Sequence, residues 1–130
     1  MFGLNLTHQA LATSEVVDRM RAMPHAVGQA AAAWMGFLGA AYERLWDVTE
    51  PPVHDPCTVF ALIEPESVRY VDSFVAVETE GTWTRGATVV DLASRWGREP
   101  NVRVATELDA GRYWHVVLDA IDTVGRAQSS

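Results

Sequence analysis

The segment from Ala26 to Tyr42 constrains the fold most, because Gln29 is its only polar side chain. Such a segment must either cross a membrane or be covered by other parts of the protein. It is dominated by Ala and Gly, lacks flanking charges, and is shorter than the roughly 20 strongly apolar residues that a membrane span needs. We therefore predict a buried helix of a soluble protein, from about His25 to Trp46, and no membrane partner. Small residues that allow another backbone to approach closely recur at every fourth position: Gly28, Ala32, Gly36 and Ala40.

Composition predicts one globular domain over residues 1–130, with 48% hydrophobic and 21% charged residues. The net charge of −7 argues against a nucleic-acid partner, because such surfaces are basic. The single cysteine, Cys57, cannot form an internal disulfide, and no secretory leader is recognisable at the start. These features favour a cytoplasmic protein.

Hydrophobic periodicity predicts an α/β fold with the element order β-α-α-α-β-β-β-α. The alternation of Phe2, Leu4 and Leu6 indicates a strand that begins almost at the first residue. Thr13 or Ser14 can cap a helix that ends at Pro24, and Asp109 can cap the last helix. The other predicted elements are the helix at 25–46, a helix from Pro56 to about Ile63, and strands at 73–80, 87–92 and 102–108.

The last helix is predicted to have an apolar face and a solvent-exposed face, called the wet face below. His115, Asp119 and Asp122 fall on the wet face, where such pairs are common and no further metal ligands converge. His8 and His25 have no evident partner, and the tail at 126–130 is predicted to fray. The predicted buried stripe consists of Tyr113, Trp114, Val117, Leu118 and Ile121.

The stretch from Val53 to Phe60 is the most plausible place for chemistry. His54 and Asp55 stand side by side where an irregular segment becomes a helix, so both side chains can turn toward one cavity. The simpler interpretation is that Asp55 is a helix N-cap followed by Pro56 at the first helical position. His54 would then be an ordinary histidine, and both interpretations remain open from these residues alone.

From Met1 to about Val124 the chain resembles the C-terminal part of the nucleoside hydrolases, the inosine-uridine and pyrimidine ribonucleoside group. The four blocks that carry this resemblance are Phe2-Gly3-Leu4-Asn5-Leu6-Thr7-His8-Gln9-Ala10-Leu11, Pro52-Val53-His54-Asp55-Pro56-Cys57, Thr84-Arg85-Gly86-Ala87-Thr88-Val89-Val90-Asp91 and Asn101-Val102-Arg103-Val104-Ala105. They occur in the family's order and approximate spacing. The resemblance implies a layered fragment of the nucleoside hydrolase fold.

The resemblance also implies a mechanism, in which a ribonucleoside is hydrolysed to ribose and a free base with the help of calcium. By that resemblance Asp55 is a calcium ligand, and His54 lies near the base as its proton donor or orienting group. Tyr42 and Trp46, four residues apart, would border the nucleobase pocket, although simple packing explains them as well. Asn5 and Thr7 would belong to strand and pocket architecture.

Two of the family's motifs are absent from these 130 residues: the aspartate-rich Asp-x-Asp-Pro-Gly-x-Asp-Asp and the Asn-Glu-Phe-Asn block. Calcium takes roughly 6–8 oxygen ligands, so Asp55 alone cannot hold it tightly. We therefore expect a truncated nucleoside hydrolase that, as this chain alone, neither binds calcium tightly nor turns over nucleosides. The alternatives are a non-catalytic domain that self-assembles or binds a partner, and a small-ligand binder that uses the His54 pocket.

The expected truncation also predicts a homodimer or larger assembly. A sheet that lacks its neighbours presents unpaired strand edges and apolar surface, and both favour self-association. The predicted contact is the N-terminal strand or the Ala/Gly-rich helix.

Overall fold

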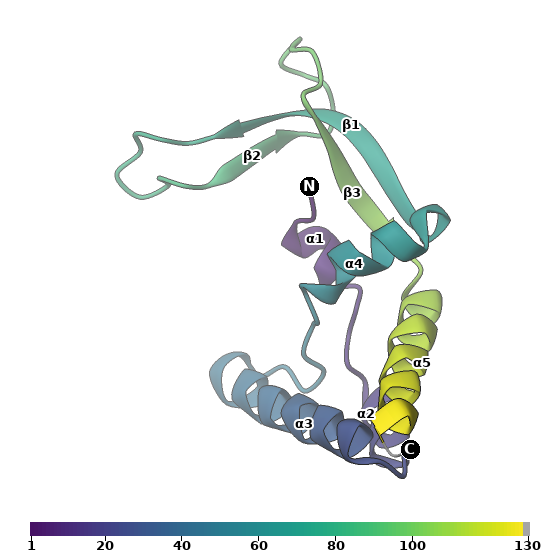
Figure 1. Ribbon diagram of the computed structural model, residues 1–130. Coiled ribbons are helices and arrows are strands. Elements are labelled where there is room, and N and C mark those ends of the chain that lie inside the picture. Colours follow the sequence, from purple (N-terminus) through teal and green to yellow (C-terminus); the bar gives the residue numbers. More distant parts are fainter. Residues whose placement is uncertain (129–130) are drawn as a thin grey trace.

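The computed structural model describes residues 1–128 and contains one three-stranded sheet and a set of helices (Figure 1). The predicted tail residues 129–130 lie outside the described part, and residues 126–128, predicted to fray, are helical. The elements in chain order are α1 (Leu4–Thr7), α2 (Ser14–Arg21), α3 (Ala26–Trp46), α4 (Pro56–Ile63), the 3-10 helix η1 (Pro65–Ser67), β1 (Val68–Val77), β2 (Thr88–Asp91), β3 (Val102–Leu108) and α5 (Ala110–Gln128). The α/β class is confirmed.

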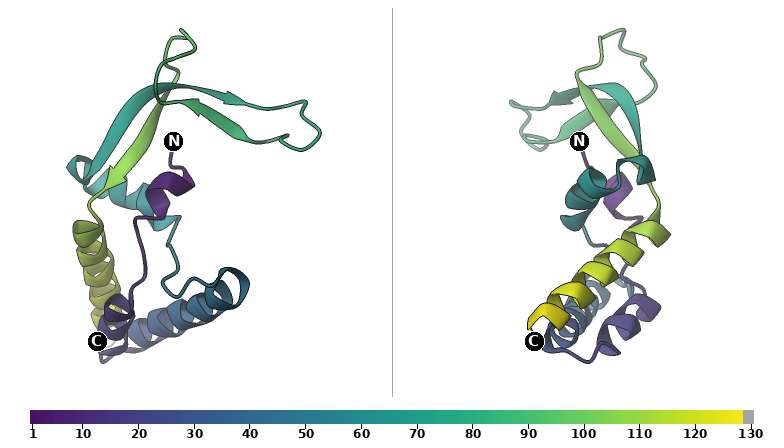
Figure 2. Two further views of the ribbon diagram at one scale, coloured as in Figure 1. Left: turned by 180° about the vertical axis from the view of Figure 1, so that it is seen from behind. Right: turned by 45° about the vertical axis from the view of Figure 1, so that its right-hand side comes forward.

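The sheet is antiparallel, and its central strand β1 serves two partners in succession. Residues 68–73 of β1 pair with β3, with a register shift between Arg69 and Tyr70, whereas Phe74 to Val77 pair with β2. The β1–β2 hairpin consequently projects as an arm, while α2, α3 and α5 gather at the opposite end of the molecule (Figure 2). The predicted pairing of these two strands and the strand at 102–108 are confirmed, but β1 begins at Val68 and ends at Val77 instead of spanning residues 73–80.

The predicted N-terminal strand is wrong, because residues Leu4–Thr7 form the short helix α1. Only Phe2 pairs with the sheet, as an isolated parallel bridge to Ala105. The amides of Leu6 and Thr7 both donate to the Gly3 carbonyl, which closes a helical turn instead of continuing a ladder. Leu6 is thereby buried while Leu4 stays 65% exposed, an outcome that strand alternation does not allow.

The helices α2 and α3 begin at residues that cap their first turns. The Thr13 hydroxyl accepts a hydrogen bond from the Val16 amide, which confirms the predicted start of α2. The predicted bounds of α3 are also confirmed, but its burial is not. Only Gly28 and Ala32 are buried, and Trp34 and Phe37 are 71% and 79% exposed. Within residues 1–128, no helix combines the length and apolar character that a membrane crossing requires.

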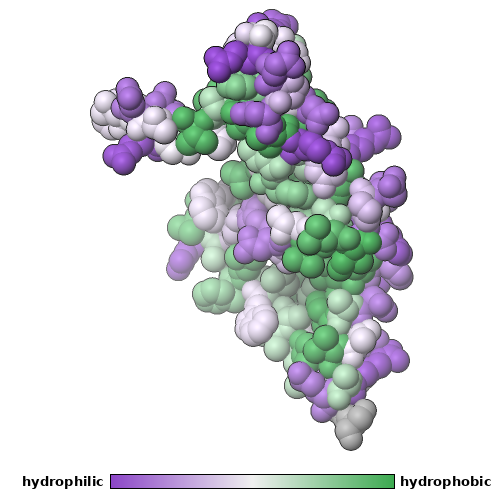
Figure 3. Space-filling view, turned by 45° about the horizontal axis from the view of Figure 1, so that its top comes forward, coloured by the Kyte–Doolittle hydropathy of each residue, from purple (hydrophilic) through white to green (hydrophobic). Residues whose placement is uncertain are grey.

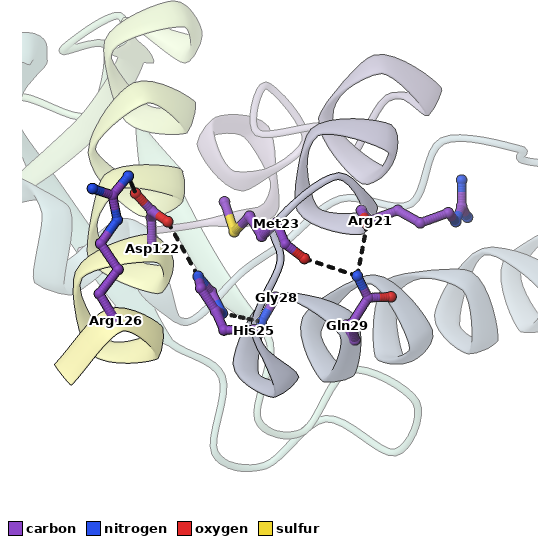
Figure 4. A network of polar contacts seen from close by, with 7 residues as sticks. All are labelled: Arg21, Met23, His25, Gly28, Gln29, Asp122 and Arg126. Atoms are coloured by element: carbon purple, nitrogen blue, oxygen red, sulfur yellow. Dashed lines mark hydrogen bonds and ion pairs between the residues drawn. The ribbon is translucent and has the colours of Figure 1, made fainter. Parts of the chain in front are cut away.

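A polar network joins the start of α3 to the end of α5 (Figure 4). The buried ring of His25 accepts a hydrogen bond from the Gly28 amide at Nδ1, 3.1 Å away, and its Nε2 lies 3.1 Å from an Asp122 carboxylate oxygen. Arg126 binds the other carboxylate oxygen at 2.5 Å. The expectations that His25 lacks a partner and that Asp122 only faces water are therefore wrong.

The hydrophobic core lies between α5, α4, α1 and α2. Tyr113 is fully buried and contacts Phe60 edge-on, with ring centroids 5.4 Å apart. Leu6, Met20 and Leu118 are buried in the same cluster. The predicted apolar stripe of α5 is confirmed, because each of its members is buried in this cluster or packs against it. α1 and α4 are thereby fixed at the centre of the molecule.

Candidate functional site

The segment that carries His54 is held in place by backbone hydrogen bonds to the segment after α1. The Val53 amide donates to the Ala10 carbonyl and the Ala12 amide donates to the Pro51 carbonyl, both at 2.9 Å. These bonds accompany an antiparallel bridge between Leu11 and Pro52. Because α4 then begins at Pro56, His54 is fixed between α1 and the start of α4.

Both nitrogens of the His54 ring face a hydroxyl group. The Thr7 hydroxyl oxygen lies 2.8 Å from Nδ1, and the Tyr42 hydroxyl oxygen lies 3.3 Å from Nε2. The ring of His8 is tilted against the His54 ring, with centroids 5.8 Å apart. The ring is thus held from two sides, by α1 and by α3, and it is only half-buried.

Tyr42 and Trp46 lie at the end of α3 nearest His54. Their rings are 4.6 Å apart at an interplanar angle of 56°, so they form one aromatic surface. Tyr42 is half-buried and touches His54, whereas Trp46 is 61% exposed and reaches His54 only through Tyr42. The structure therefore brings Tyr42 and His54 together and leaves Trp46 at the edge of the group.

Asp55 is exposed and does not cap α4 with its side chain. Its backbone is helical, with φ −62° and ψ −42°, and its carbonyl accepts hydrogen bonds from the Thr58 amide and hydroxyl. Asp55 and Pro56 therefore occupy the predicted N-cap and first helical positions of α4, but the Asp55 carboxylate makes no capping hydrogen bond. Among residues 1–128 no group of three or more His, Cys, Asp or Glu side chains converges on a metal site. Since calcium needs roughly 6–8 oxygen ligands, the described residues by themselves do not fit a calcium ion.

Cys57, two positions after Asp55, is a free cysteine of the core. It is fully buried, and its Sγ donates to the Val53 carbonyl at 3.3 Å. Burial raises the pKa of the Cys57 thiol, since a thiolate is poorly solvated in the core. Cys57 belongs to the same core cluster as Tyr113 and packs α4 into that core.

Hollows of the chain lie elsewhere, among them one of about 750 Å³ that is lined by Leu62, Tyr70 and Arg103. One of about 490 Å³ lies between α2 and α3 and is lined by residues such as Asp18, Arg21 and Glu43. Another of about 420 Å³ lies between α2 and α5, beside His115 and Asp119. Neither of these two hollows includes His54, whose side chain is half-buried.

Thr7 and His8 are the site residues whose contacts sequence reasoning missed. A strand from Met1 would turn Leu6 and Thr7 to opposite faces, whereas in α1 both are buried and the Thr7 hydroxyl reaches His54. The Thr-His pair within a block that resembles a known family was the signal that pointed to this segment.

Comparison with known proteins assigns the family. The family model described as inosine-uridine preferring nucleoside hydrolase matches residues 1–115. The chain is 34% identical over 128 residues to the pyrimidine-specific ribonucleoside hydrolase RihA of Shewanella woodyi, covering 97% of this chain and 41% of that protein. It is 41% identical over 134 residues to the inosine-uridine preferring nucleoside hydrolase of Leishmania major, covering 98% of this chain and 40% of the relative.

Solved structures have the same fold. A purine-preferring ribonucleoside hydrolase from Gardnerella vaginalis superposes with a TM-score of 0.81 and 26% identity, covering 98% of this chain and 40% of that one. A plant nucleoside hydrolase superposes with a TM-score of 0.79 at 23% identity, over 92% and 40% of the two chains, and shows the fold alone. This chain thus spans about 40% of the length of these relatives. Because the family model covers most of its residues, the chain belongs to the inosine-uridine preferring nucleoside hydrolase family.

Proposed function

We propose that this chain carries the base-facing corner of a site that cleaves the N-glycosidic bond of ribonucleosides. The single observation that carries the proposal is the His54 ring held between the Thr7 and Tyr42 hydroxyls. Family membership supports ribonucleosides as the substrate class, since the relatives are named for acting on them. The activity of full-length relatives comes to this chain only as a proposal, because it spans about 40% of their length.

The role proposed for His54 is to protonate or orient the departing base. In glycoside cleavage the transition state is oxocarbenium-like, and the leaving group needs a proton as the bond to the sugar breaks. Imidazole suits this task because its ordinary pKa lies near neutral pH. Tyr42 and Trp46 would offer their aromatic faces to the flat base, although their mutual contact is also ordinary packing.

The role proposed for Asp55 is that of one ligand to calcium. Its exposed carboxylate is compatible with that role, but the described residues provide no further converging ligands. We therefore propose that the isolated chain neither binds calcium tightly nor hydrolyses nucleosides. A cytoplasmic setting is also proposed, which the single unpaired thiol of Cys57 supports.

Titration of the full chain with uracil and uridine tests the base-facing corner. In amide and side-chain NMR spectra we expect the His54 and Tyr42 resonances of the wild-type chain to move, and the Tyr42 resonances to stay unmoved in His54→Ala. His115→Ala is the matched control, because His115 is an exposed histidine of α5. Unmoved resonances of His54 and Tyr42 at millimolar ligand would overturn the proposal.

A direct assay tests the proposed lack of activity. The purified chain is incubated with uridine or inosine and calcium, and free base is separated by chromatography. We expect no release above the uncatalysed rate. Release of base that disappears in Asp55→Ala would show that the isolated chain is an enzyme.

A second candidate function, self-association, is favoured by the exposed face of α3. Trp34, Phe37 and Leu45 follow one stripe of the helix and are all mostly exposed. Figure 3 shows apolar residues gathered into patches on the face in view, whereas the tip of the hairpin arm is mostly hydrophilic. The proposed occupant is a second copy of this chain.

The lack of charge on this part of α3 supports a second copy of the chain as the partner. Two copies of the segment from Ala26 to Tyr42 can meet without like-charge repulsion, because the segment carries no charged side chain although the whole chain has a net charge of −7. The alternative contact was proposed for an N-terminal strand, and residues Leu4–Thr7 form the helix α1 instead of that strand. Light scattering across micromolar concentrations tests the proposal, and a strictly monomeric species would overturn it.

A further inference from the structure

The Thr7 hydroxyl is a buried polar group whose position is fixed by α1. Thr7 is only 4% exposed, and its amide is bonded to the Gly3 carbonyl. Within residues 1–128, His54 Nδ1 is the one hydrogen-bond partner that its hydroxyl has, at 2.8 Å. The direction of this single bond therefore decides whether the hydroxyl proton is satisfied.

The neutral His54 ring has two tautomers, and each reverses both of its hydrogen bonds. With the proton on Nδ1, the ring donates to Thr7 and accepts from the Tyr42 hydroxyl. With the proton on Nε2, the ring accepts from Thr7 and donates to Tyr42. The two arrangements use the same distances, 2.8 Å and 3.3 Å, so burial must separate them.

Burial favours the second arrangement. If Nδ1 donated to Thr7, the hydroxyl proton of Thr7 would be buried without an acceptor. A buried donor that has no hydrogen-bond partner costs about 1–3 kcal/mol. Tyr42 has no such constraint, since its side chain is half-buried and water can take its hydroxyl proton.

We infer that Thr7 is a positioning residue for His54: its hydroxyl donates to Nδ1 and keeps the proton of the neutral ring on Nε2. This inference rests on the proposed function only where it says what the Nε2 proton is for, namely to protonate or orient the departing base. Nε2 faces Tyr42, so the proton stands on the side of the aromatic surface of Tyr42 and Trp46. The longer 3.3 Å contact to Tyr42 is the weaker of the two bonds and is the one that a ligand can replace.

The inference specifies the chemistry that a ligand must present at this corner. An Nε2–H donor pairs with an acceptor, which in a nucleobase is a carbonyl oxygen or an unprotonated ring nitrogen. A ligand that offers only a donor at that position would leave two donors facing each other.

Imidazole ¹⁵N spectra of the full chain test the inference directly, at a pH well above the ordinary histidine pKa of about 6.5. In the wild-type chain we expect Nδ1 of His54 to resonate as an unprotonated nitrogen and Nε2 as a protonated one. Thr7→Ser keeps the hydroxyl and should keep this pattern. Thr7→Val has nearly the same shape without the hydroxyl, so the two resonances should move toward each other as the tautomers mix.

Thr58→Val is the matched control, because the Thr58 hydroxyl donates to the Asp55 carbonyl at 2.8 Å beside the same site without touching the ring. It should leave both nitrogens of His54 unchanged. A protonated Nδ1 in the wild-type chain would overturn the inference, and so would unchanged His54 resonances in a folded Thr7→Val. If Thr7→Val fails to fold, a protonated Nδ1 in the wild-type spectrum would still overturn the inference.

The same samples separate this inference from the proposed function. If the tautomer is as expected but uracil and uridine move no resonance, the nucleobase proposal fails and the role of Thr7 stands. If the ligands bind but Nδ1 is protonated, the role of Thr7 fails and the nucleobase proposal stands.

Discussion

Gly125 lies so close to His25 that a β-carbon at position 125 would fall 2.0 Å from the ring nitrogen Nδ1. Gly125 belongs to α5 and His25 is the N-cap residue of α3. Because residue 125 has no side chain, the imidazole ring fits against the backbone of α5. The ring is enclosed between the helices, where it caps α3 and meets Asp122.

Gly125→Ala should destabilise the protein, because the added methyl group must displace the His25 ring. Overpacking of this kind costs about 1–3 kcal/mol, from which the better helix propensity of Ala subtracts a part. Gly36→Ala is the matched control, since that glycine of α3 has open space around its missing side chain. It should stabilise the protein by up to about 1 kcal/mol. Urea unfolding measures both, and equal effects of the same sign would contradict the role of Gly125.

Asp122→Asn should lower the melting temperature at neutral pH by an amount that shrinks in acid. Arg126, and after it His25, bind the Asp122 carboxylate and hold its pKa below the ordinary value. A lowered folded pKa gives stability that is present above the unfolded value of about 3.9 and is lost as pH falls through the folded pKa. Thermal unfolding at pH 7 and pH 3 measures the difference.

Asp119→Asn is the comparison for that experiment, because it removes a charge from the exposed side of α5 without touching His25. It should change the melting temperature less at neutral pH. A loss in Asp122→Asn that is as large at pH 3 as at pH 7 would show that the carboxylate charge is not what stabilises this junction.

Tyr42→Ala should weaken uracil binding more than Tyr42→Phe. Stacking of a base on an aromatic ring contributes about 1–3 kcal/mol, and Phe keeps the ring while losing only the 3.3 Å contact to His54. Calorimetric or NMR titration of the folded variants measures the two affinities. Equal affinities in Tyr42→Ala and the wild-type chain would remove Tyr42 from the base-facing corner.

Phe37→Glu should convert the proposed dimer to monomers, because it places a charge on the exposed stripe of α3 in both copies. Trp83→Glu is the control, since Trp83 is 94% exposed in the connection between β1 and β2, away from α3. Sedimentation or light scattering distinguishes the two species. Dissociation by Trp83→Glu alone would move the contact to the hairpin arm.

Local patterns predicted most of the elements, because their causes are local. Thr13 and Asp109 cap helices at the predicted places, and Arg112 donates its amide to the Asp109 carboxylate as a first-turn residue should. The two exceptions depend on distant residues. The N-terminal alternation yields to a helical turn that buries Leu6 beside β3, and the apolar composition of α3 did not reveal how little of it other elements cover.

The sequence predicted which residues belong to the candidate site better than it predicted the contacts between them. Family-like blocks pointed to His54, and the four-residue spacing placed Tyr42 on the helix face that meets it. The bond from Thr7 to His54 spans 47 positions, and the pair of His25 and Asp122 spans 97. Such contacts follow from tertiary packing, which no short pattern encodes.

The divided pairing of β1 gives one strand two ladders, and the Asn101 side chain links them by accepting from the Val75 amide and donating to the Val75 carbonyl. Since β3 bonds to residues 68–73 and β2 only to residues 74–77, the outer ladder can open without costing the inner one a hydrogen bond. The inner ladder holds α1 against the sheet through the bridge of Phe2 to Ala105 and the hydrogen bond from the Asn5 side chain to the Ala105 carbonyl, and neither contact uses a residue of the arm.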